Sequence, residues 1–139
     1  MRLLAIDFGT KKCGIAISDP LKIISQPLTI IFYKNNDYDY LINQIKKIIE
    51  EYKPIEKIIL GITKNINNEV STIGKITMKF KSILEEKINN IEIVLFDEKY
   101  STKKSLEIMQ QMNIKTKKKG ELKDAIAAQK ILEDYMSSH

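Results

Sequence analysis

The sequence predicts an α/β fold in which a mixed five-stranded sheet is flanked by helices. The apolar runs 3–8 and 14–19 are separated by only about four residues. That is too short for the crossover that parallel neighbours need, so we expect an antiparallel hairpin. The later apolar runs 58–62 and 91–96 each follow a segment with helical spacing. Right-handed crossovers through those helices would lay both runs parallel to the first strand.

The first strand ends in an acid. Strand alternation places Asp7 on one face together with Leu3 and Ala5, and places Leu4 and Ile6 on the other. A carboxylate that ends an otherwise buried strand is costly unless a cation repays its desolvation. The alternative is that the acid only caps the turn that follows.

The next segments predict an edge strand, a helix and a buried strand. Residues 22–32 are rich in β-formers but contain Pro27, which indicates an edge strand or a bulge. Residues 37–52 have apolar positions at helical spacing, and Pro54 ends this helix. The run 58–62 is nearly all apolar, as is typical of a buried parallel strand.

The second half of the chain predicts three helices around the last strand. We expect helices over 70–88, over 103–112 with Ser101 as its N-cap, and over 121–136. Residues 115–119 are interpreted as a basic loop that ends in a glycine.

Composition limits the possible functions. The 139 residues predict one domain, 1–139, with 43% hydrophobic content and a formal charge of +5. We expect a cytoplasmic protein, because no apolar stretch approaches the ~18 residues of a membrane span and no secretory signal is evident. Cys13 is the only cysteine and His139 the only histidine. A Ser-His-Asp triad, a Cys-His pair and a zinc hydrolase site are therefore excluded. Any metal must be bound by oxygen ligands, which points to Mg²⁺ or Mn²⁺.

Acidic residues are predicted to gather at one edge of the sheet. Parallel strands share a carboxyl edge, which collects Asp7 and the pair Asp97 and Glu98. Strand parity lets only one acid of that pair point into the site, and Glu98 is favoured for its reach. Asp124 begins the final helix and is the candidate third ligand; the alternative is an acid that suits the helix dipole. Three carboxylates without histidine suit two-metal hydrolysis of a phosphodiester.

Lysines near these acids are candidate phosphate ligands. They are Lys11, Lys64 and the run 115–119, for which the alternative is a solvated loop. Asp19 is instead interpreted as a turn residue, because Pro20 follows it.

Four motifs in register resemble the YqgF/RuvX-like family, described as pre-16S rRNA nucleases and as Holliday junction resolvases. The match covers nearly the whole chain, from about Leu3 to Tyr135. The matching residues are Asp7-Phe8-Gly9-Thr10-Lys11-Lys12 with Gly14, Ala16, Ser18 and Asp19; Gly61 with Lys64-Asn65; Asp97-Glu98-Lys99 with Ser101-Thr102; and Lys123-Asp124 with Ala127-Ala128.

The resemblance implies a ribonuclease H-like fold with strand order 3-2-1-4-5 and strand 2 antiparallel. It implies a nuclease that uses Mg²⁺ or Mn²⁺ and processes the 5′ end of 16S rRNA, with ribosomal particles as possible partners and a monomer or weak homodimer as its state. Metal ligands would be Asp7, Glu98 and Asp124, with Asp97 as a further catalytic candidate. The implied substrate-binding residues are Thr10, Lys11, Lys12, Lys64, Asn65, Lys99, Ser101, Thr102 and Lys123.

The sequence departs from the family pattern at positions that grip phosphate. The family usually has arginine where Lys12 and Lys99 stand, and lysine cannot form the same bidentate fork. Three alternative functions remain open at this point. They are a DNA junction resolvase, a non-catalytic nucleic-acid-binding factor on the same fold, and a phosphate-binding module of the actin and sugar-kinase type, which would need two such domains.

Overall fold

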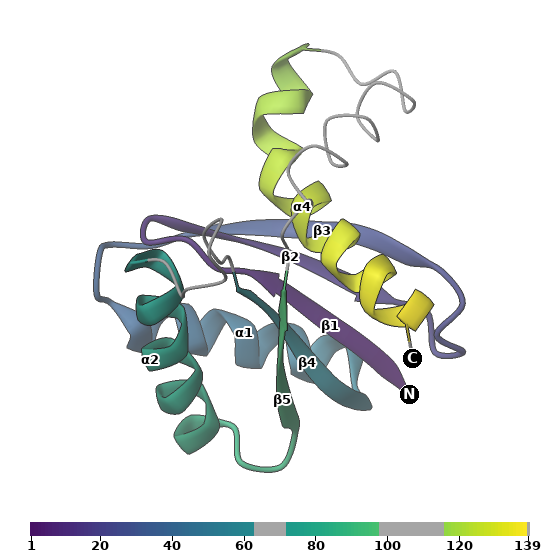
Figure 1. Cartoon of the computed structure of the whole chain (residues 1–139), viewed down its shortest axis with the longest axis horizontal. Helices are drawn as coiled ribbons and strands as arrows, with labels where there is room; N and C mark the ends of the chain where they lie inside the picture. Colours follow the sequence, from purple (N-terminus) through teal and green to yellow (C-terminus); the bar gives the residue numbers. More distant parts are fainter. Residues whose placement is uncertain (63–71, 98–115, 139) are drawn as a thin grey trace.

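The computed structural model of the chain describes residues 1–62, 72–97 and 116–138, with side chains described in these ranges except at 72–73, 97 and 116–124. Within these residues the chain forms one five-stranded sheet in the order β3-β2-β1-β4-β5 (Figure 1). The predicted strand order is confirmed. The predicted helix 103–112 lies outside the described residues.

The first three strands form an antiparallel meander. Their bounds are β1 Arg2–Asp7, β2 Lys12–Ser18 and β3 Ser25–Phe32. The β2–β3 register shifts between Ile15 and Ala16, opposite the stretch that holds Pro27. Proline has no N–H to donate to the ladder, so it is accommodated at a bulge on the edge strand. Both alternatives offered for Pro27 are therefore confirmed.

The last two strands are parallel to β1, as predicted. Helix α1 Tyr38–Tyr52 leads into β4 Ile55–Ile62, and α2 Thr72–Lys87 leads into β5 Glu92–Asp97. Strand β4 begins earlier than predicted. Ile55 and Lys57 pair with Arg2 and Leu3 of β1 across a register shift at Glu56, and the Arg2 N–H donates to the Pro54 carbonyl at 3.1 Å. Pairing with a neighbour, and not apolarity alone, thus fixes where the strand starts.

The two faces of the sheet carry separate apolar clusters. Leu4 and Ile6 pack in the larger cluster, where Phe80 of α2 and residues of α1 also lie. Leu3 and Ala5 pack in the smaller cluster against α4 Thr116–Ser138. Figure 1 shows α1 and α2 on one side of the sheet and α4 on the other. The predicted alternation along β1 is confirmed.

Helix α4 begins at Thr116, so the prediction of a basic loop over 115–119 is wrong for residues 116–119. Lysine has a helix propensity close to that of alanine, so a lysine run does not end a helix. Gly120 costs about 1 kcal/mol relative to alanine in a helix interior, which a long helix can absorb. Further along, Ala125 and Ala128 are fully buried, which lets the helix pack closely on the sheet, as expected.

Among the residues that the structure describes, no helix is long and apolar enough to cross a membrane.

Candidate active site

Strand β1 ends in Asp7, at the edge where the parallel strands finish. Ile6 pairs with Leu60 of β4, and Ile62 pairs with Asp97 of β5. Strand β4 therefore lies between the two acid-bearing strand ends, as predicted. Asp7 is half-buried and, by strand alternation, belongs to the face that α4 covers. This edge of the sheet is where open α/β folds bind ligands.

Asp7 lines an open hollow of about 230 Å³, formed by residues 7–12. We call residues 8–11, which join β1 to β2, the first turn. A Cβ atom placed on Gly9 would lie 2.6 Å from the Lys12 carbonyl oxygen, so only glycine fits there. Lys11 and Lys12 are exposed beside the hollow. The arrangement offers a carboxylate and two cations at one opening.

Tyr33 holds the first turn in place. Its backbone N–H donates to the Lys11 carbonyl at 3.0 Å, and its hydroxyl donates to the Gly9 carbonyl. The Cys13 thiol lies 3.7 Å from the same Gly9 oxygen. Burial, followed by the neighbouring Cys13 and Tyr38, raises the pKa of the Tyr33 hydroxyl above its ordinary value. The hydroxyl therefore stays protonated and remains a donor at physiological pH.

Sequence analysis missed Tyr33. Its position directly after the edge strand is the only sequence signal for this role, and that signal is weak. The hydroxyl bond joins residues 24 apart in the chain. Only the pairing of β2 with β3 brings them together.

Helix α4 runs in the direction opposite to β1. At its carboxyl end, Tyr135 lies near the start of β4, with its hydroxyl 3.4 Å from the Lys57 ammonium, and its ring meets the Phe96 ring edge-on at 5.8 Å. One turn and a half earlier, the Gln129 amide donates to the Ser25 carbonyl at 3.1 Å, at the start of β3. Ser25 pairs with Ser18, whose hydroxyl accepts from the Leu3 N–H, so these contacts hold the second half of α4 over the amino end of β1. Figure 1 shows the carboxyl end of α4 beside the start of β1.

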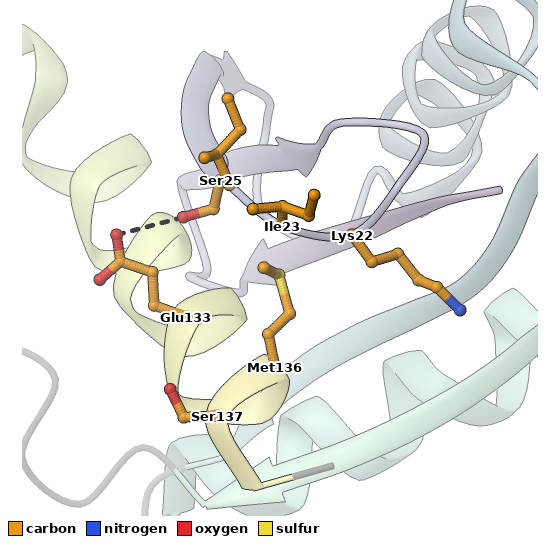
Figure 2. A pocket seen from close by; sticks show the side chains of 7 residues that line it. Lys22, Ile23, Ser25, Glu133, Met136 and Ser137 are labelled. Atoms are coloured by element: carbon orange, nitrogen blue, oxygen red, sulfur yellow. Dashed lines mark hydrogen bonds between the residues drawn. The ribbon is translucent and has the colours of Figure 1, made fainter.

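A larger hollow lies at the other end of β2 (Figure 2). It measures about 430 Å³ and separates the β2–β3 connection from the last turns of α4. The Ser25 hydroxyl donates to the Glu133 carboxylate at 3.2 Å across its rim, and Ile23 and Met136 also line it. Its one acid, Glu133, accepts from Ser25, and it lies at the edge of the sheet opposite to the one where the parallel strands end, so the smaller hollow at Asp7 is the candidate site.

Asp19 closes the β2–β3 connection, which we call the second turn and define as residues 19–24. Its Oδ1 atom accepts from the N–H groups of Ile23 at 2.7 Å and Ile24 at 2.9 Å. These backbone donors, with Ile24 the strongest, lower the pKa of the Asp19 carboxyl from its ordinary value of 3.8. The prediction that Asp19 is a turn residue is confirmed.

The structure brings some of the predicted site residues together and leaves the others undecided. Asp7, Thr10, Lys11 and Lys12 line one hollow. Asp97 ends β5, and Lys123 and Asp124 belong to α4, but their side chains are outside the description. Among the described side chains, no three acids, histidines or cysteines come together to hold a metal. The remaining predicted residues lie outside the described ranges: Lys64, Asn65, Glu98, Lys99, Ser101 and Thr102.

Comparison with known proteins identifies the family. The family model RuvX, described as Holliday junction resolvase, matches residues 1–138. Two relatives are each named "Putative pre-16S rRNA nuclease". The one from Aster yellows witches'-broom phytoplasma is 41% identical over 96% of this chain and 87% of its own length. The one from Acetivibrio thermocellus is 37% identical over 99% of this chain and 96% of its own length.

A solved structure shares the fold. The fowlpox virus resolvase, solved with Holliday junction DNA, superposes with a TM-score of 0.60 at 17% identity, covering 99% of this chain and 98% of that one. This likeness agrees with the ribonuclease H-like fold that the sequence resemblance implied. Because the family model spans almost every residue and relatives exceed 30% identity over nearly the whole chain, the chain belongs to the RuvX family.

Proposed function

We propose that this chain is a metal-dependent endonuclease that hydrolyses phosphodiester bonds of structured nucleic acid, and that its substrate is the 5′ end of pre-16S rRNA. The observation that carries the proposal is the position of Asp7. It is a half-buried carboxylate at the carboxyl end of a central strand, and it opens into a hollow beside two exposed lysines. Membership of the RuvX family supports this nuclease chemistry.

The direction of α4 supports Asp124 as a partner of Asp7. Position 124 lies eleven residues before Tyr135, or about 16 Å along the helix. Asp7 lies four residues after Leu3, or about 13 Å along β1. Tyr135 and Leu3 line the same hollow, so these two lengths are compatible with a site shared by Asp7 and Asp124, which supports the pairing.

The available ligand atoms fit a hard divalent cation. Asp7, Glu98 and Asp124 would supply carboxylate oxygens, with Asp97 as a further candidate on β5, and such oxygens suit Mg²⁺ or Mn²⁺. The Cys13 thiol is fully buried in the cluster on the opposite face from Asp7, so it does not compete for the metal. When bound, a pair of such ions activates a water and stabilises the leaving oxygen.

The first turn would position the substrate. Lys11 and Lys12 are exposed point charges that attract phosphate, and Thr10 adds a hydroxyl at the same opening. Gly9 allows the backbone to fold tightly there, and Tyr33 fixes the turn, so the cations keep a defined distance from Asp7. The other proposed phosphate ligands follow from the family resemblance: Lys64, Asn65, Lys99, Ser101, Thr102 and Lys123.

The choice of RNA rests on the relatives, which are named as pre-16S rRNA nucleases. A ribosome precursor as substrate would put the protein in the cytoplasm and bring it to ribosomal particles. The description of the family and the junction complex of the fowlpox enzyme favour a second candidate, a DNA junction resolvase.

A two-substrate assay tests the proposal. The purified chain is incubated with Mg²⁺ or Mn²⁺ and either a pre-rRNA 5′ fragment or a four-way DNA junction. We expect cleavage of the RNA fragment, and loss of it in Asp7→Asn, Glu98→Gln and Asp124→Asn, with Asp19→Asn as the matched control. Cleavage of the junction alone would change the substrate to DNA. Cleavage retained by all three variants, or binding without any cleavage by the unaltered chain, would contradict the nuclease mechanism.

A further inference from the structure

Two aromatic side chains stand in solvent near the candidate site. Phe32, the last residue of edge strand β3, is 65% exposed, and Tyr40, in the first turn of α1, is 46% exposed. Two hollows lie beside the β3–α1 connection, of about 440 and 410 Å³, and each is lined by both aromatic side chains. Single exposed apolar residues are ordinary, but two aromatics that share a concave surface indicate a contact site.

This surface continues into the first turn. Phe32 is the pairing partner of Lys12, and the next residue, Tyr33, donates its N–H to the Lys11 carbonyl. Strand parity assigns Phe32 and Lys12 to the face of the sheet that also carries Asp7. From the strand spacing and rise, the Cα atoms of Phe32 and Asp7 are separated by about 12 Å. That distance corresponds to three or four nucleotides at the ~3.4 Å stacked spacing of a duplex strand.

The charges along this path favour a polyanion. Lys11 and Lys12 are exposed at the hollow that Asp7 lines, and Lys34 is exposed at one of the hollows that the two aromatics line. Of the acids on the aromatic side, Asp37 accepts from the Tyr40 N–H at 3.3 Å and caps α1, Asp39 lies in the first turn of α1, and Glu51 lines the far part of the larger hollow. A surface that alternates cations with aromatic rings is the arrangement by which proteins bind single-stranded nucleic acid.

We propose that Phe32 and Tyr40 form a stacking site for an unpaired nucleobase of the substrate strand. The phosphates of that strand pass over Lys11 and Lys12 on the way to Asp7. This inference rests on the proposed nuclease function and adds that the substrate is single-stranded a few nucleotides from the cleaved bond. Stacking needs only a π-face, so the site accepts any base.

A second copy of the chain adding a strand to the free edge of β3 is the competing explanation. The register shift opposite Pro27 interrupts the ladder along β3, and proline supplies no N–H for a further strand. The nucleobase is therefore the better occupant.

Fluorescence of 2-aminopurine tests the stacking directly. The base analogue is placed at successive positions of short single-stranded RNA, and the full chain is titrated without divalent metal, so that binding is measured without cleavage. We expect quenching at one or two adjacent positions. Phe32→Leu and Tyr40→Leu keep apolar bulk but remove the ring, so each should abolish the quenching and weaken binding about tenfold. Phe32→Tyr should restore both.

Met78→Leu is the matched control, because Met78 is 45% exposed on α2 and lies outside this surface. It should bind and quench like the unaltered chain. Wild-type binding and quenching in both leucine variants would overturn the stacking site while leaving the nuclease proposal intact. So would a Phe32→Leu variant that changes only the oligomeric state measured by light scattering. Failure of the unaltered chain to bind any nucleic acid would overturn both proposals.

Discussion

The two turns at the ends of strand β2 are built differently. The first turn is held by residues outside it: the Tyr33 hydroxyl and backbone N–H donate to its carbonyls, and Lys12 lies close to Gly9. The second turn is shaped from within, because the Asp19 carboxylate accepts from two of its own N–H groups. An acid stands at the start of each turn, since Asp7 ends β1 and Asp19 follows the last residue of β2, yet only Asp7 opens into a hollow beside exposed lysines.

The difference separates a structural acid from a candidate catalytic one. Asp19 interacts with backbone donors, which explains its presence without any ligand. The second turn presents apolar side chains to solvent, at Leu21, Ile23 and Ile24, and its lysine, Lys22, is paired with Glu56 at 2.9 Å. The first turn and the start of β2 instead present Lys11 and Lys12. A polyanionic substrate therefore has one suitable end of β2 to approach.

Exchanging the carboxyl for an amide at each turn should give the largest contrast. Asp7→Asn should lower the cleavage rate by at least about two orders of magnitude, as is typical when a charge-stabilising group is removed. Asp19→Asn should leave the rate within about twofold, because the amide oxygen still accepts a backbone N–H. Rates on the pre-rRNA fragment at saturating Mg²⁺ measure this. Equal losses in the two variants would show that the acids are not functionally distinct.

A methyl group added at the first turn should destabilise the fold. Gly9→Ala places a Cβ atom 2.6 Å from the Lys12 carbonyl, and relieving such overpacking costs roughly 1–3 kcal/mol. The measurement is the free energy of unfolding in urea.

Lys22→Gly at the second turn is the matched control. Lys22 has a φ of 58°, and its ammonium lies 2.9 Å from Glu56. Glycine relieves the strain of the left-handed backbone, whereas loss of the exposed ion pair is destabilising. Because the two effects oppose each other, the free energy of unfolding should change by less than about 1 kcal/mol. If Lys22→Gly lowered the free energy of unfolding more than Gly9→Ala does, the first turn would not be the more tightly constrained of the two.

Removing the Tyr33 hydroxyl should loosen the first turn alone. Tyr33→Phe leaves the Gly9 carbonyl without this donor and should cost about 0.5–1.5 kcal/mol of unfolding free energy. Tyr52→Phe, whose ring lies 5.7 Å from the Arg2 guanidinium, should keep its packing and change stability by less than about 0.5 kcal/mol. Hydrogen exchange at residues 9–12 should accelerate in Tyr33→Phe only. Unchanged exchange there would remove Tyr33 from its positioning role.

The smallest expected effect is a pH dependence at the second turn. The pKa of the folded Asp19 carboxyl is lowered, chiefly by the Ile24 N–H, below its ordinary value of 3.8. Its contribution to stability is therefore fully present above about pH 4 and is lost as the pH falls through the lowered value. Between pH 6 and pH 3, the free energy of unfolding should fall less steeply with decreasing pH in Asp19→Asn than in the unaltered chain. Identical slopes would mean that the carboxylate does not stabilise the turn.

Sequence patterns predicted the sheet because its strands follow simple rules. Leu3, Ala5 and Asp7 share a face because side chains alternate along a strand, and β4 returns parallel because a helix precedes it. The start of β4 was missed because Glu56 and Lys57 break the apolar pattern, although Ile55 and Lys57 pair with β1.

The site was predicted less completely than the sheet. Its acids follow strand ends, which the sequence shows, but the support from Tyr33 depends on a long-range pairing that no local pattern contains. The prediction of a basic loop fails at residues 116–119 because a run of lysines has a helix propensity close to that of alanine and so continues the helix. Local rules therefore found the candidate ligands, while tertiary contacts determine how the first turn is held beside them.

Binding of Mn²⁺ is the most direct test of the central claim that Asp7 and Asp124 share one site. Free Mn²⁺ is followed by electron paramagnetic resonance during titration of the unaltered chain, Asp7→Asn, Asp124→Asn and the control Asp19→Asn. We expect saturable binding that is lost in both Asp7→Asn and Asp124→Asn and retained in Asp19→Asn. Unchanged binding in Asp124→Asn would contradict it, because the two acids would then not hold the same metal.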